Sequence, residues 1–416
     1  MASLFSSLPI CSFPKQAQWK RFSNNRSSYH VLNVFSLSQS EATTEISVES
    51  DIVRRSANYH PPIWDYDYLQ SLGLHHVEVY VSLSYCFNDK NPIILELAIL
   101  DYNIVQAMHQ EDLRYASLWW KDLGIGERLT FARDRLMENF LWSVGIIGAP
   151  QFGRGRRIQT KVNALITYID DVYDVYGTMD ELELFTDVVE RWDINAIQKL
   201  PNYMKLCFHA LHNSINDMAF HTLKEQGIDV LPFLKNLWAN LCKSYMLEAR
   251  WFYIGYKPNL QEYIENAWIS ISAPVLLGHA YLETNHVTKE GLKTFEAYHP
   301  NIIRWSSTVL RLANDLATSS VSDISKSIQC YMHETGGSEE EAREHIKKLI
   351  DAAWKNMNKD QMAAKSLSSR MFFETAMNLA RVSMLVYQND DGHGIEDGEP
   401  KERALRLFIQ SVPLPK

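Results

Sequence analysis

The stretch Lys161–Thr178 reads KVNALITYIDDVYDVYGT, and its apolar residues recur mostly at steps of three and four. This is the spacing of one face of an α-helix. The stripe consists of Val162, Leu165, Ile166, Ile169, Val172, Tyr173 and Tyr176. Similar stripes fill the ranges Pro92–Met108, Glu181–Trp192, Asn202–Lys224, Val230–Phe252, Ser338–Met357 and Phe372–Tyr387. The sequence therefore predicts an all-α helical bundle over residues 91–416.

The rest of the chain supports this fold class. Strand-like alternation is confined to Val77–Tyr85, which fits nothing around it. A chain of 416 residues with 46% hydrophobic residues can bury a large core. Only 17 glycines and 14 prolines are present, which favours long helices over a turn-rich β fold. Breaks between the stripes, and therefore expected helix ends, fall near Gly177, Pro201, Gly227, Pro258, Pro300 and Gly336.

The overall charge and the cysteines restrict the possible partners. The net charge is −9, so we expect no nucleic-acid partner. An acidic protein with an anionic substrate needs local positive charge from metal ions or placed arginines. No run is long and apolar enough to span a bilayer. The cysteines lack paired spacing and indicate reduced, mostly buried thiols of an intracellular enzyme. They are Cys11, Cys86, Cys207, Cys242 and Cys330.

The first forty residues differ from the rest. They hold ten serines and four basic residues but no Asp or Glu. This composition is typical of an organelle transit peptide, which we place at residues 1–50. A merely disordered tail is the alternative.

The sharpest chemical signal is Asp170-Asp171-Val172-Tyr173-Asp174. Asp170 and Asp174 are i,i+4 neighbours and project from one face of a helix. An apolar run precedes them, so the carboxylates lie at the end of a buried helix. Such crowding of like charges is unfavourable unless a cation offsets it, and hard oxygen ligands suit Mg²⁺. The alternative is an acidic helix end that faces solvent.

Two further clusters could serve a bound anion. Asn314 and Thr318 are also i,i+4, and Arg311 lies about one turn earlier, so the three form a plausible second metal and phosphate site. Arg133 and Arg135 flank Asp134 and could converge on one anion from an unwound helix start. The alternatives are exposed polar residues for the first cluster and a surface salt-bridge cluster for the second.

These clusters belong to a longer set of motifs. The set comprises RDR at 133–135, FLW at 140–142, IDDVYDVYGT at 169–178, ERWDIN at 190–195, NDLATSS at 314–320, KSIQCYMHE at 326–334 and DGHG at 391–394. Together they resemble the plant terpene synthase family, and most closely its angiosperm monoterpene synthase branch. Arg54-Arg55, with eight residues before Trp64, looks like that branch's tandem-arginine motif. The resemblance covers residues 50–75 and 91–416.

The resemblance implies a set of roles around a prenyl diphosphate. Mg²⁺ (or Mn²⁺) ions on the diphosphate would be held by Asp170, Asp171, Asp174, Asn314 and Thr318. The departing diphosphate would be bound by Arg133, Arg135 and Arg311, with Asp170, Asp174 and Asn314 also contacting substrate. This is electrostatic catalysis directed at charge that develops on the leaving group.

The resemblance also implies residues around the carbocation. Trp142 would face it from an aromatic pocket, and the alternative is an ordinary core aromatic. Tyr387 and Asp391 match a loop region that closes the pocket and takes part in the last proton transfer; otherwise they lie in a mobile surface loop. Arg54 and Arg55 would cap the closed site, and the alternative is a disordered basic patch.

Two departures from the family pattern stand out. Little more than Leu74–Asn91 occupies the place of a large helical N-terminal domain, so residues 51–90 are interpreted as a remnant of it. The second metal motif of the family ends in a Glu, where this chain has Ser322. The nearest acid, Asp323, would be rotated about 100° around a helix.

The expected function is Mg²⁺-dependent ionisation of geranyl diphosphate in a plastid, followed by cyclisation or elimination to a monoterpene. Three alternatives remain: a weak or silent truncated homologue, an isoprene or sesquiterpene synthase, and a chain-elongating prenyltransferase. The last would need a second Asp-rich motif where Asn314 and Thr318 stand. Loss of the N-terminal domain is expected to expose apolar surface, with self-association as the consequence.

Overall fold

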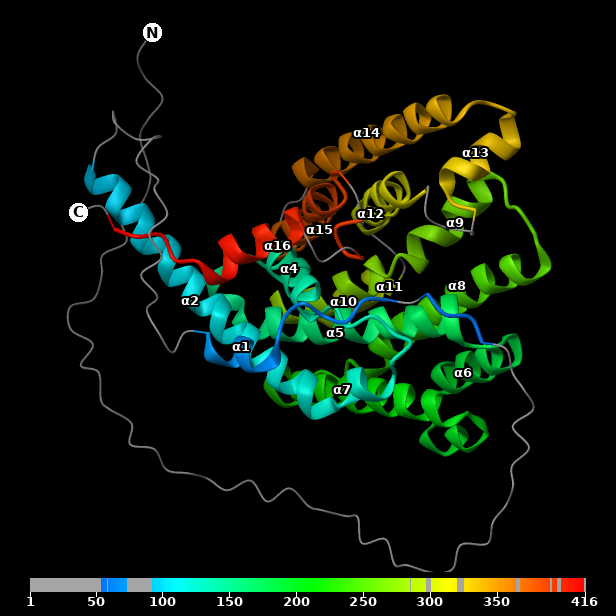
Figure 1. The fold of residues 1–416 in the computed structure, drawn as a ribbon, viewed down its shortest axis with the longest axis horizontal. Helices are drawn as coiled ribbons and strands as arrows, with labels where there is room; N and C mark the ends of the chain where they lie inside the picture. Colours follow the sequence, from blue (N-terminus) through cyan, green and yellow to red (C-terminus); the bar gives the residue numbers. More distant parts are fainter. Residues whose placement is uncertain are drawn as a thin grey trace, which may run out of the picture. The chain divides into compact units, whose positions relative to one another are not determined.

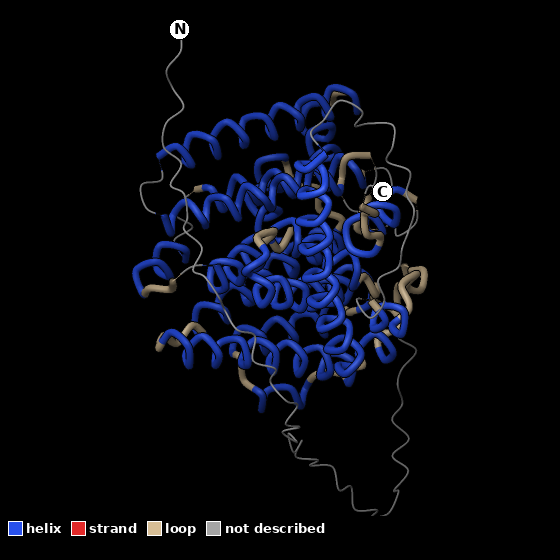
Figure 2. The backbone as a smooth tube through the Cα atoms, turned by 90° about the vertical axis from the view of Figure 1, so that its left-hand side faces the viewer, coloured by secondary structure: helices blue, strands red, loops and turns tan. Residues whose placement is uncertain are grey.

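The computed structural model describes residues 54–57, 59–72, 92–284, 286–296, 301–319, 325–363, 367–389, 391–394 and 398–414. Within these ranges the chain forms helices joined by loops, and no described residue lies in a strand (Figure 2). The prediction of an all-α fold is confirmed. The strand-like segment Val77–Tyr85 lies outside the described residues, as do residues 1–53 with the expected transit peptide.

The helices begin and end near the expected breaks. Their bounds are α1 Tyr66–Ser71, α2 Pro92–Leu123, α3 Ile125–Arg128, α4 Leu136–Ile146, α5 Gly153–Asp171, α6 Met179–Arg191, α7 Asn202–Gln226, α8 Leu231–Ile254, α9 Leu260–Ser270, α10 Ala273–Thr284, α11 Lys289–Glu296, α12 Ile302–Thr318, α13 Ser327–Thr335, α14 Glu339–Ala363, α15 Leu367–Val386 and α16 Glu399–Ala404. Single π-helical turns follow α5 at Val172–Tyr176 and α16 at Leu405–Ile409.

Local chemistry explains several of these boundaries. At the start of α6, the carboxylate of Glu181 accepts a hydrogen bond from the backbone N–H of Thr178, as in a capping box. At the start of α9, the side chain of Asn259 accepts one from Glu262. Helices α7 and α8 both end at a glycine with positive φ, Gly227 and Gly255, which a side chain would disfavour.

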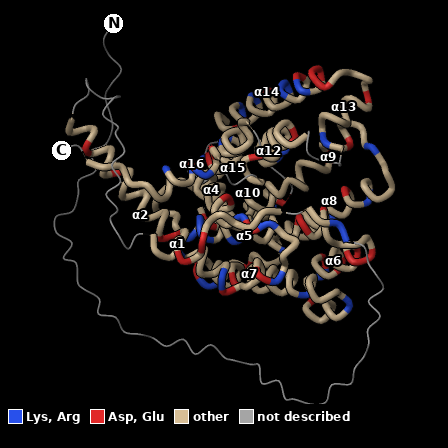
Figure 3. The backbone as a smooth tube through the Cα atoms, in the orientation of Figure 1, with Lys and Arg blue, Asp and Glu red and all other residues tan. Residues whose placement is uncertain are grey.

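Helices α5, α8 and α12 each pack against several other helices. Helix α5 contacts α2, α4 and α10, and α12 contacts both α14 and α15, with α14 drawn above them in Figure 1. Helix α8 packs against α6, α9 and α10. Figure 3 shows acidic residues gathered at the start of α14, and these include Glu339, Glu340 and Glu341 in its first turn. Negative charge there complements the partial positive charge of the helix N-terminus.

The C-terminal π-helical turn closes one side of the core. Phe408 is fully buried and packs edge-on against Phe140 of α4, with ring centroids 5.0 Å apart. The side-chain amide of Gln106 on α2 donates to the backbone carbonyls of Arg406 and Gln410 at 3.1 and 3.0 Å. Helix α2 and the C-terminal turn, which lie about 300 residues apart in the sequence, therefore stabilise one another. The cysteines Cys207, Cys242 and Cys330 are buried and unpaired, as expected of reduced thiols.

The first half of α2 carries an exposed apolar face. Ile93, Ile94, Leu97 and Ile104 are 74%, 65%, 65% and 61% exposed. Apolar side chains at this spacing normally mark a helix face that packs against another element. In the described part of the chain, none of the helices is long and apolar enough to cross a bilayer.

Candidate active site

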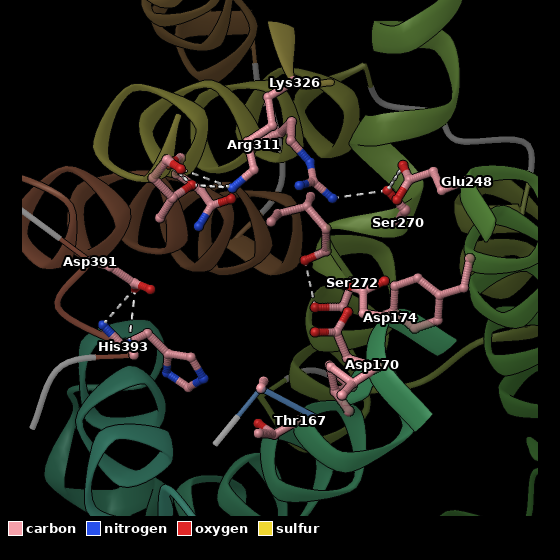
Figure 4. Close-up of a pocket in the computed structure, with 18 of the residues that line it drawn as sticks. Thr167, Asp170, Asp174, Glu248, Ser270, Ser272, Arg311, Lys326, Asp391 and His393 are labelled. Carbon is pink, nitrogen blue, oxygen red and sulfur yellow. Dashed lines mark hydrogen bonds between the residues drawn. The ribbon is translucent and has the colours of Figure 1, made fainter. Parts of the chain in front are cut away.

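A cavity of about 870 Å³, here called the active cavity, opens between α4, α5, α8, α9 and α12. It is lined by the predicted residues Arg55, Arg133, Trp142, Asp170, Asp174, Arg311, Asn314, Thr318, Tyr387 and Asp391. Three other predicted residues, Arg54, Arg135 and Asp171, do not line it. Figure 4 shows Asp170 and Asp174 on one side of the cavity and Arg311 and Glu248 across from them.

Asp170 and Asp174 lie where α5 ends and the π-helical turn begins. Burial raises the pKa of Asp174 well above its usual value, and the negative charges of Asp170 and Glu248 add to this effect. The positive charge of Arg133 opposes it. A carboxyl group in such surroundings binds a proton or a metal cation readily, because either one relieves the crowded negative charge.

Asp171 does not line the active cavity and holds Arg133. Its carboxylate accepts hydrogen bonds from the backbone N–H of Arg133 at 2.7 Å, from Nε at 2.9 Å and from the hydroxyl of Tyr59 at 3.0 Å. The same guanidinium donates from Nη2 to Asp170 at 2.7 Å. Asp171 is fully buried, so its side chain cannot reach a ligand in the cavity without giving up these bonds. Asp171 therefore differs from Asp170 and Asp174 in that it does not line the active cavity, and its role as a metal ligand remains a prediction.

Arg311 is held on the opposite wall by α9. Its Nε donates to the carbonyl of Ala267 at 3.1 Å and its Nη2 to Oγ of Ser270 at 2.9 Å. Asp315, one turn later, is fully buried and accepts from the hydroxyl of Tyr263 at 3.0 Å. These contacts fix a guanidinium at the cavity wall before any ligand arrives.

The second predicted metal site is only partly assembled. The hydroxyl of Thr318 donates to the carbonyl of Asn314 at 2.8 Å and accepts from the ammonium of Lys326. Lys326 also lines the active cavity. Ser322 and Asp323 lie outside the described residues, so the carboxylate that the family pattern places here has no described counterpart.

An aromatic wall joins α4 to the end of α15. The rings of Trp142 and Tyr387 are 5.9 Å apart between centroids, and both line the active cavity. Burial raises the pKa of Tyr387, and a hydrogen bond with Asn314 acts in the opposite direction. The tyrosine therefore stays protonated at neutral pH.

The 391–394 loop follows this wall. Asp391 accepts a hydrogen bond from the backbone N–H of Gly394 at 2.9 Å, which folds the loop back on itself. Arg135, for which binding of the diphosphate remains a prediction, donates to the carbonyl of Gly394 at 3.2 Å and to that of Asp134 at 3.0 Å. Its side chain is almost completely buried behind the loop, which explains why it does not line the cavity.

The two arginines of the tandem motif have different surroundings. Arg54 makes two hydrogen bonds of 2.9 Å to Glu181 of α6 and lies over the ring of Tyr176 at 4.5 Å. Burial alone would raise the pKa of Glu181, but hydrogen bonds, first among them those from Arg54, lower it to about 2. Arg55 lies over the ring of Phe252 at 4.4 Å and lines the active cavity. Arg54 thus fastens the segment, and Arg55 faces the cavity.

Several cavity residues were not predicted as site residues, among them Glu248, Lys326 and Ser272. Glu248 accepts from Ser270 at 2.5 Å and from Asn266 at 3.0 Å, and burial raises its pKa. Glu248 is the one acidic residue in the largely apolar helix α8, and this isolated charge could have indicated a site residue. Ser272 has a φ of 65° and marks the break between α9 and α10, where Pro274 in the first turn of α10 is the local sequence signal.

Comparison with known proteins identifies the family. Residues 121–356 match the model described as "Terpene synthase family, metal binding domain". The chain therefore belongs to the terpene synthase family.

Individual relatives agree with this assignment. "Terpene synthase 10" of Ricinus communis is 60% identical over 78% of this chain and 60% of its own length. "Myrcene synthase, chloroplastic" of Quercus ilex is 60% identical over 79% of this chain and 55% of its own length. The crystal structure of isoprene synthase from grey poplar, in complex with three Mg²⁺ ions and dimethylallyl-S-thiolodiphosphate, is 45% identical and superposes with a TM-score of 0.75 over 79% of this chain and 64% of that one. This chain spans only about three fifths of the length of such relatives.

The donor atoms around the active cavity suit a divalent cation. Asp170, Asp174 and Glu248 supply hard oxygen ligands in a buried setting, and membership of this family implies dependence on a divalent metal. No three His, Cys, Asp or Glu side chains among the described residues are close enough to form a complete protein ligand set. This is compatible with Mg²⁺, which usually takes one or two carboxylates and fills its other positions with water and phosphate oxygens.

Proposed function

We propose that this chain ionises geranyl diphosphate and converts the resulting carbocation to a monoterpene, with release of diphosphate. The proposal rests on one observation: carboxylates and a guanidinium lie on opposite walls of the active cavity. Asp170 and Asp174 face it from one wall and Arg311 from the other (Figure 4), and Trp142 and Tyr387 also line the cavity. The relative named as a myrcene synthase supports a ten-carbon substrate.

In the proposed reaction the diphosphate lies between the aspartate wall and the arginine wall. Mg²⁺ (or Mn²⁺) held by Asp170 and Asp174 would neutralise the charge that grows on the leaving group. Arg133 and Arg311 are already oriented by Asp171 and Ser270, so they donate hydrogen bonds to the departing diphosphate without further ordering. Asn314 and Thr318 are proposed to complete the polar end of the site.

The carbocation would then be left against the aromatic wall. The faces of Trp142 and Tyr387 stabilise positive charge through their quadrupoles, and a dry cavity protects the cation from capture by water. Arg55 is proposed to cap the cavity, with Arg54 holding it in place through Glu181. Asp391, which lines the cavity from the adjacent loop, is proposed to take part in the final proton transfer.

The deciding experiment incubates the purified chain and Mg²⁺ with geranyl, dimethylallyl or farnesyl diphosphate and analyses the headspace by gas chromatography. We expect volatile ten-carbon products from geranyl diphosphate, and their loss in Asp170→Ala. Products mainly from dimethylallyl or farnesyl diphosphate would instead establish the isoprene or sesquiterpene alternative.

A weak or silent homologue is the second candidate, and one observation favours it. The ammonium of Lys326 contacts Thr318, where a metal ligand is proposed, and position 322 is a serine. Loss of a metal ligand commonly lowers metal affinity by about tenfold or more. If Ser322→Glu lowers the Mg²⁺ concentration for half-maximal rate, the position contributes to metal binding. Complete inactivity of both forms would favour the silent homologue.

We also propose a plastid location and self-association. The acid-free, serine-rich start of the chain and the relative named as chloroplastic support the first. A fluorescent fusion of residues 1–52 is expected to enter plastids, and a uniformly cytosolic signal would contradict this. The exposed apolar face of α2 supports the second.

A further inference from the structure

A second cavity lies on the side of the bundle, between α2, α5 and α7. It encloses about 690 Å³ and shares no lining residue with the active cavity. Helices α2 and α7 both pack against α5, which forms the floor between them. We call it the lateral cavity. The reaction proposed above makes no use of it.

Three cations face the lateral cavity from a single helix. Arg154, Arg157 and Lys161 follow one another on α5 at steps of three and four, so they share one face. Asp217 on α7 is the one carboxylate among the described lining residues. The lining therefore carries an excess of positive charge in a chain whose net charge is −9.

The neighbouring acids neutralise this charge only in part. Arg154 pairs with Glu283. Arg157 lies 3.6 Å from Asp112, but that carboxylate is already bound by Arg156 at 2.8 Å.

Lys161 is the least neutralised of the three cations. Within the described residues, no carboxylate oxygen lies in ion-pair distance of its ammonium. Burial lowers the pKa of Lys161, and the charges of Arg157 and Arg154 lower it further, against the opposing effect of Asp217. An anion placed here would relieve the repulsion among the three cations.

The rest of the lining is aromatic and apolar. Tyr115 and Trp119 are i,i+4 neighbours on α2, and the ammonium of Lys161 lies 5.1 and 5.2 Å from their ring centroids. The guanidinium of Arg157 lies 4.8 Å from the ring of Tyr115. Ile158 and Met218 are buried and form part of an apolar floor. A small inorganic anion would use the cations but leave this floor uncovered.

We propose that the lateral cavity binds an amphipathic anion, with its charged head on Arg157 and Lys161 and a short apolar tail against α2 and α7. Two sources supply this chemistry: a prenyl diphosphate and a medium-chain carboxylate. Cationic side chains that lie over aromatic faces suit either head group, because they are already oriented and only partly hydrated.

The test is calorimetric titration of the full chain in EDTA with three probes: geranyl S-thiolodiphosphate, decanoate and inorganic diphosphate. At least one of the two tailed probes is expected to bind saturably below about 1 mM. The double variant Arg157→Gln/Lys161→Gln should weaken that binding about tenfold or more, since charge-assisted hydrogen bonds are lost. The tighter of the two tailed probes identifies the head group.

Matched variants separate this site from other effects. Ser214→Trp fills the lateral cavity and keeps every charge, so it should also abolish binding, and thermal unfolding will confirm that it folds. Lys347→Gln/Arg406→Gln removes two exposed cations elsewhere and should leave binding unchanged. The proposal is overturned if no probe saturates, if this control weakens binding equally, or if inorganic diphosphate binds as tightly as the tailed probes. Binding in EDTA is independent of turnover, so the result does not depend on the proposed reaction.

Discussion

Two adjacent aspartates illustrate how differently neighbouring residues can be used in this protein. Asp170 faces the active cavity, while Asp171 is fully buried and holds the backbone and side chain of Arg133. On a helix, consecutive side chains diverge by about 100°, so the two cannot serve the same ligand equally. We propose that Asp171 positions Arg133 and that Asp170 binds the metal.

This difference gives the first prediction. Asp171→Ala should destabilise the fold by about 3–5 kcal/mol, because it leaves a buried guanidinium without its main partner. Asp170→Ala should change the free energy of unfolding by no more than about 1 kcal/mol, since Asp170 is partly exposed and Arg133 keeps Asp171. Urea unfolding of both variants measures the two effects.

The complementary measurement is Mn²⁺ binding in the presence of inorganic diphosphate. We expect Asp170→Ala to lose bound metal, and Asp171→Asn to retain most of it. Equal loss in the two variants would show that Asp171 is a ligand after all.

The sequence predicted which residues matter at this site better than it predicted their contacts. Spacing alone placed Asp170 and Asp174 on one face, and both line the cavity. The partner of Asp171 could not be predicted, because Arg133 lies 38 residues away and reaches it only through the packing of the bundle. Lys326 was missed for a similar reason: it lies eight residues from Thr318, at the start of α13, whereas Thr318 ends α12.

At the scale of helices, close packing rests on a few small residues. Gly145 of α4 faces Val382 of α15, and a Cβ at Gly145 would come within 2.5 Å of a methyl group of that valine. The two helices can therefore approach this closely only because position 145 lacks a side chain. Helix α15 leads directly to Tyr387 in the aromatic wall, so this contact also positions the site.

The second prediction follows from that contact. Gly145→Ala should destabilise the protein by about 1–2 kcal/mol, because the overpacking outweighs the gain in helix propensity. Val382→Ala in the same chain should restore much of the loss. The control is Gly148→Ala, whose nearest contact is an ordinary 3.4 Å. If both glycine variants have the same melting temperature, the close approach is not needed.

The third prediction concerns pH and the packing of α8 on α10. Burial lowers the pKa of His279 to about 3, and its ring accepts a hydrogen bond from the indole N–H of Trp238 at 3.3 Å. The unfolded chain takes up a proton near pH 6.5 and the folded chain does not, so stability falls as pH drops below about 6.5. We expect a loss of roughly 1 kcal/mol per pH unit between about pH 6 and pH 4.

The matched variant for this prediction is His279→Gln, which keeps an acceptor for the indole but does not titrate. Denaturant unfolding at several pH values should give a shallower acid slope for this variant than for the wild type. Parallel slopes would mean that other groups, such as the buried His109, dominate the acid response.

Helices were predictable from periodicity, and most of their ends were predictable from glycine and proline. The apolar stripes correctly indicated α5, α7, α8 and α14, because burial of one face decides their position. The break between α9 and α10 lies at Ser272, where φ is positive, and Pro274 follows two residues later. The proline indicates a helix boundary nearby, whereas the positive φ of a serine has no counterpart in the local sequence.

At the scale of the whole molecule, α2 carries apolar side chains that no other described element covers. Its first three turns present Ile93, Ile94 and Leu97 to solvent, although the helix is otherwise well packed against α5 and the C-terminal turn. Exposed apolar clusters of this kind promote association between molecules.

The fourth prediction is therefore that the chain self-associates at micromolar concentration and above. Ile94→Glu/Leu97→Glu should shift the mass measured by light scattering toward the 48.1 kDa of one chain. Met362→Glu replaces an apolar residue on α14 that is even more exposed, at 90%, and should have no such effect. A wild-type protein that stays monomeric at high concentration would contradict the prediction.

The segment before α1 has a practical consequence for how the chain can be trimmed or tagged. It runs across the bundle from α1 toward α6 and α8 (Figure 1) and is fastened there by Arg54 on Glu181 and by Tyr59 on Asp171. A protease that removes a leader must therefore stop before Arg54, or it takes away the cap and one support of Arg133 together. For the same reason an affinity tag joined directly to Arg54 would lie close to the cavity mouth, whereas one at the C-terminus would lie beside α2.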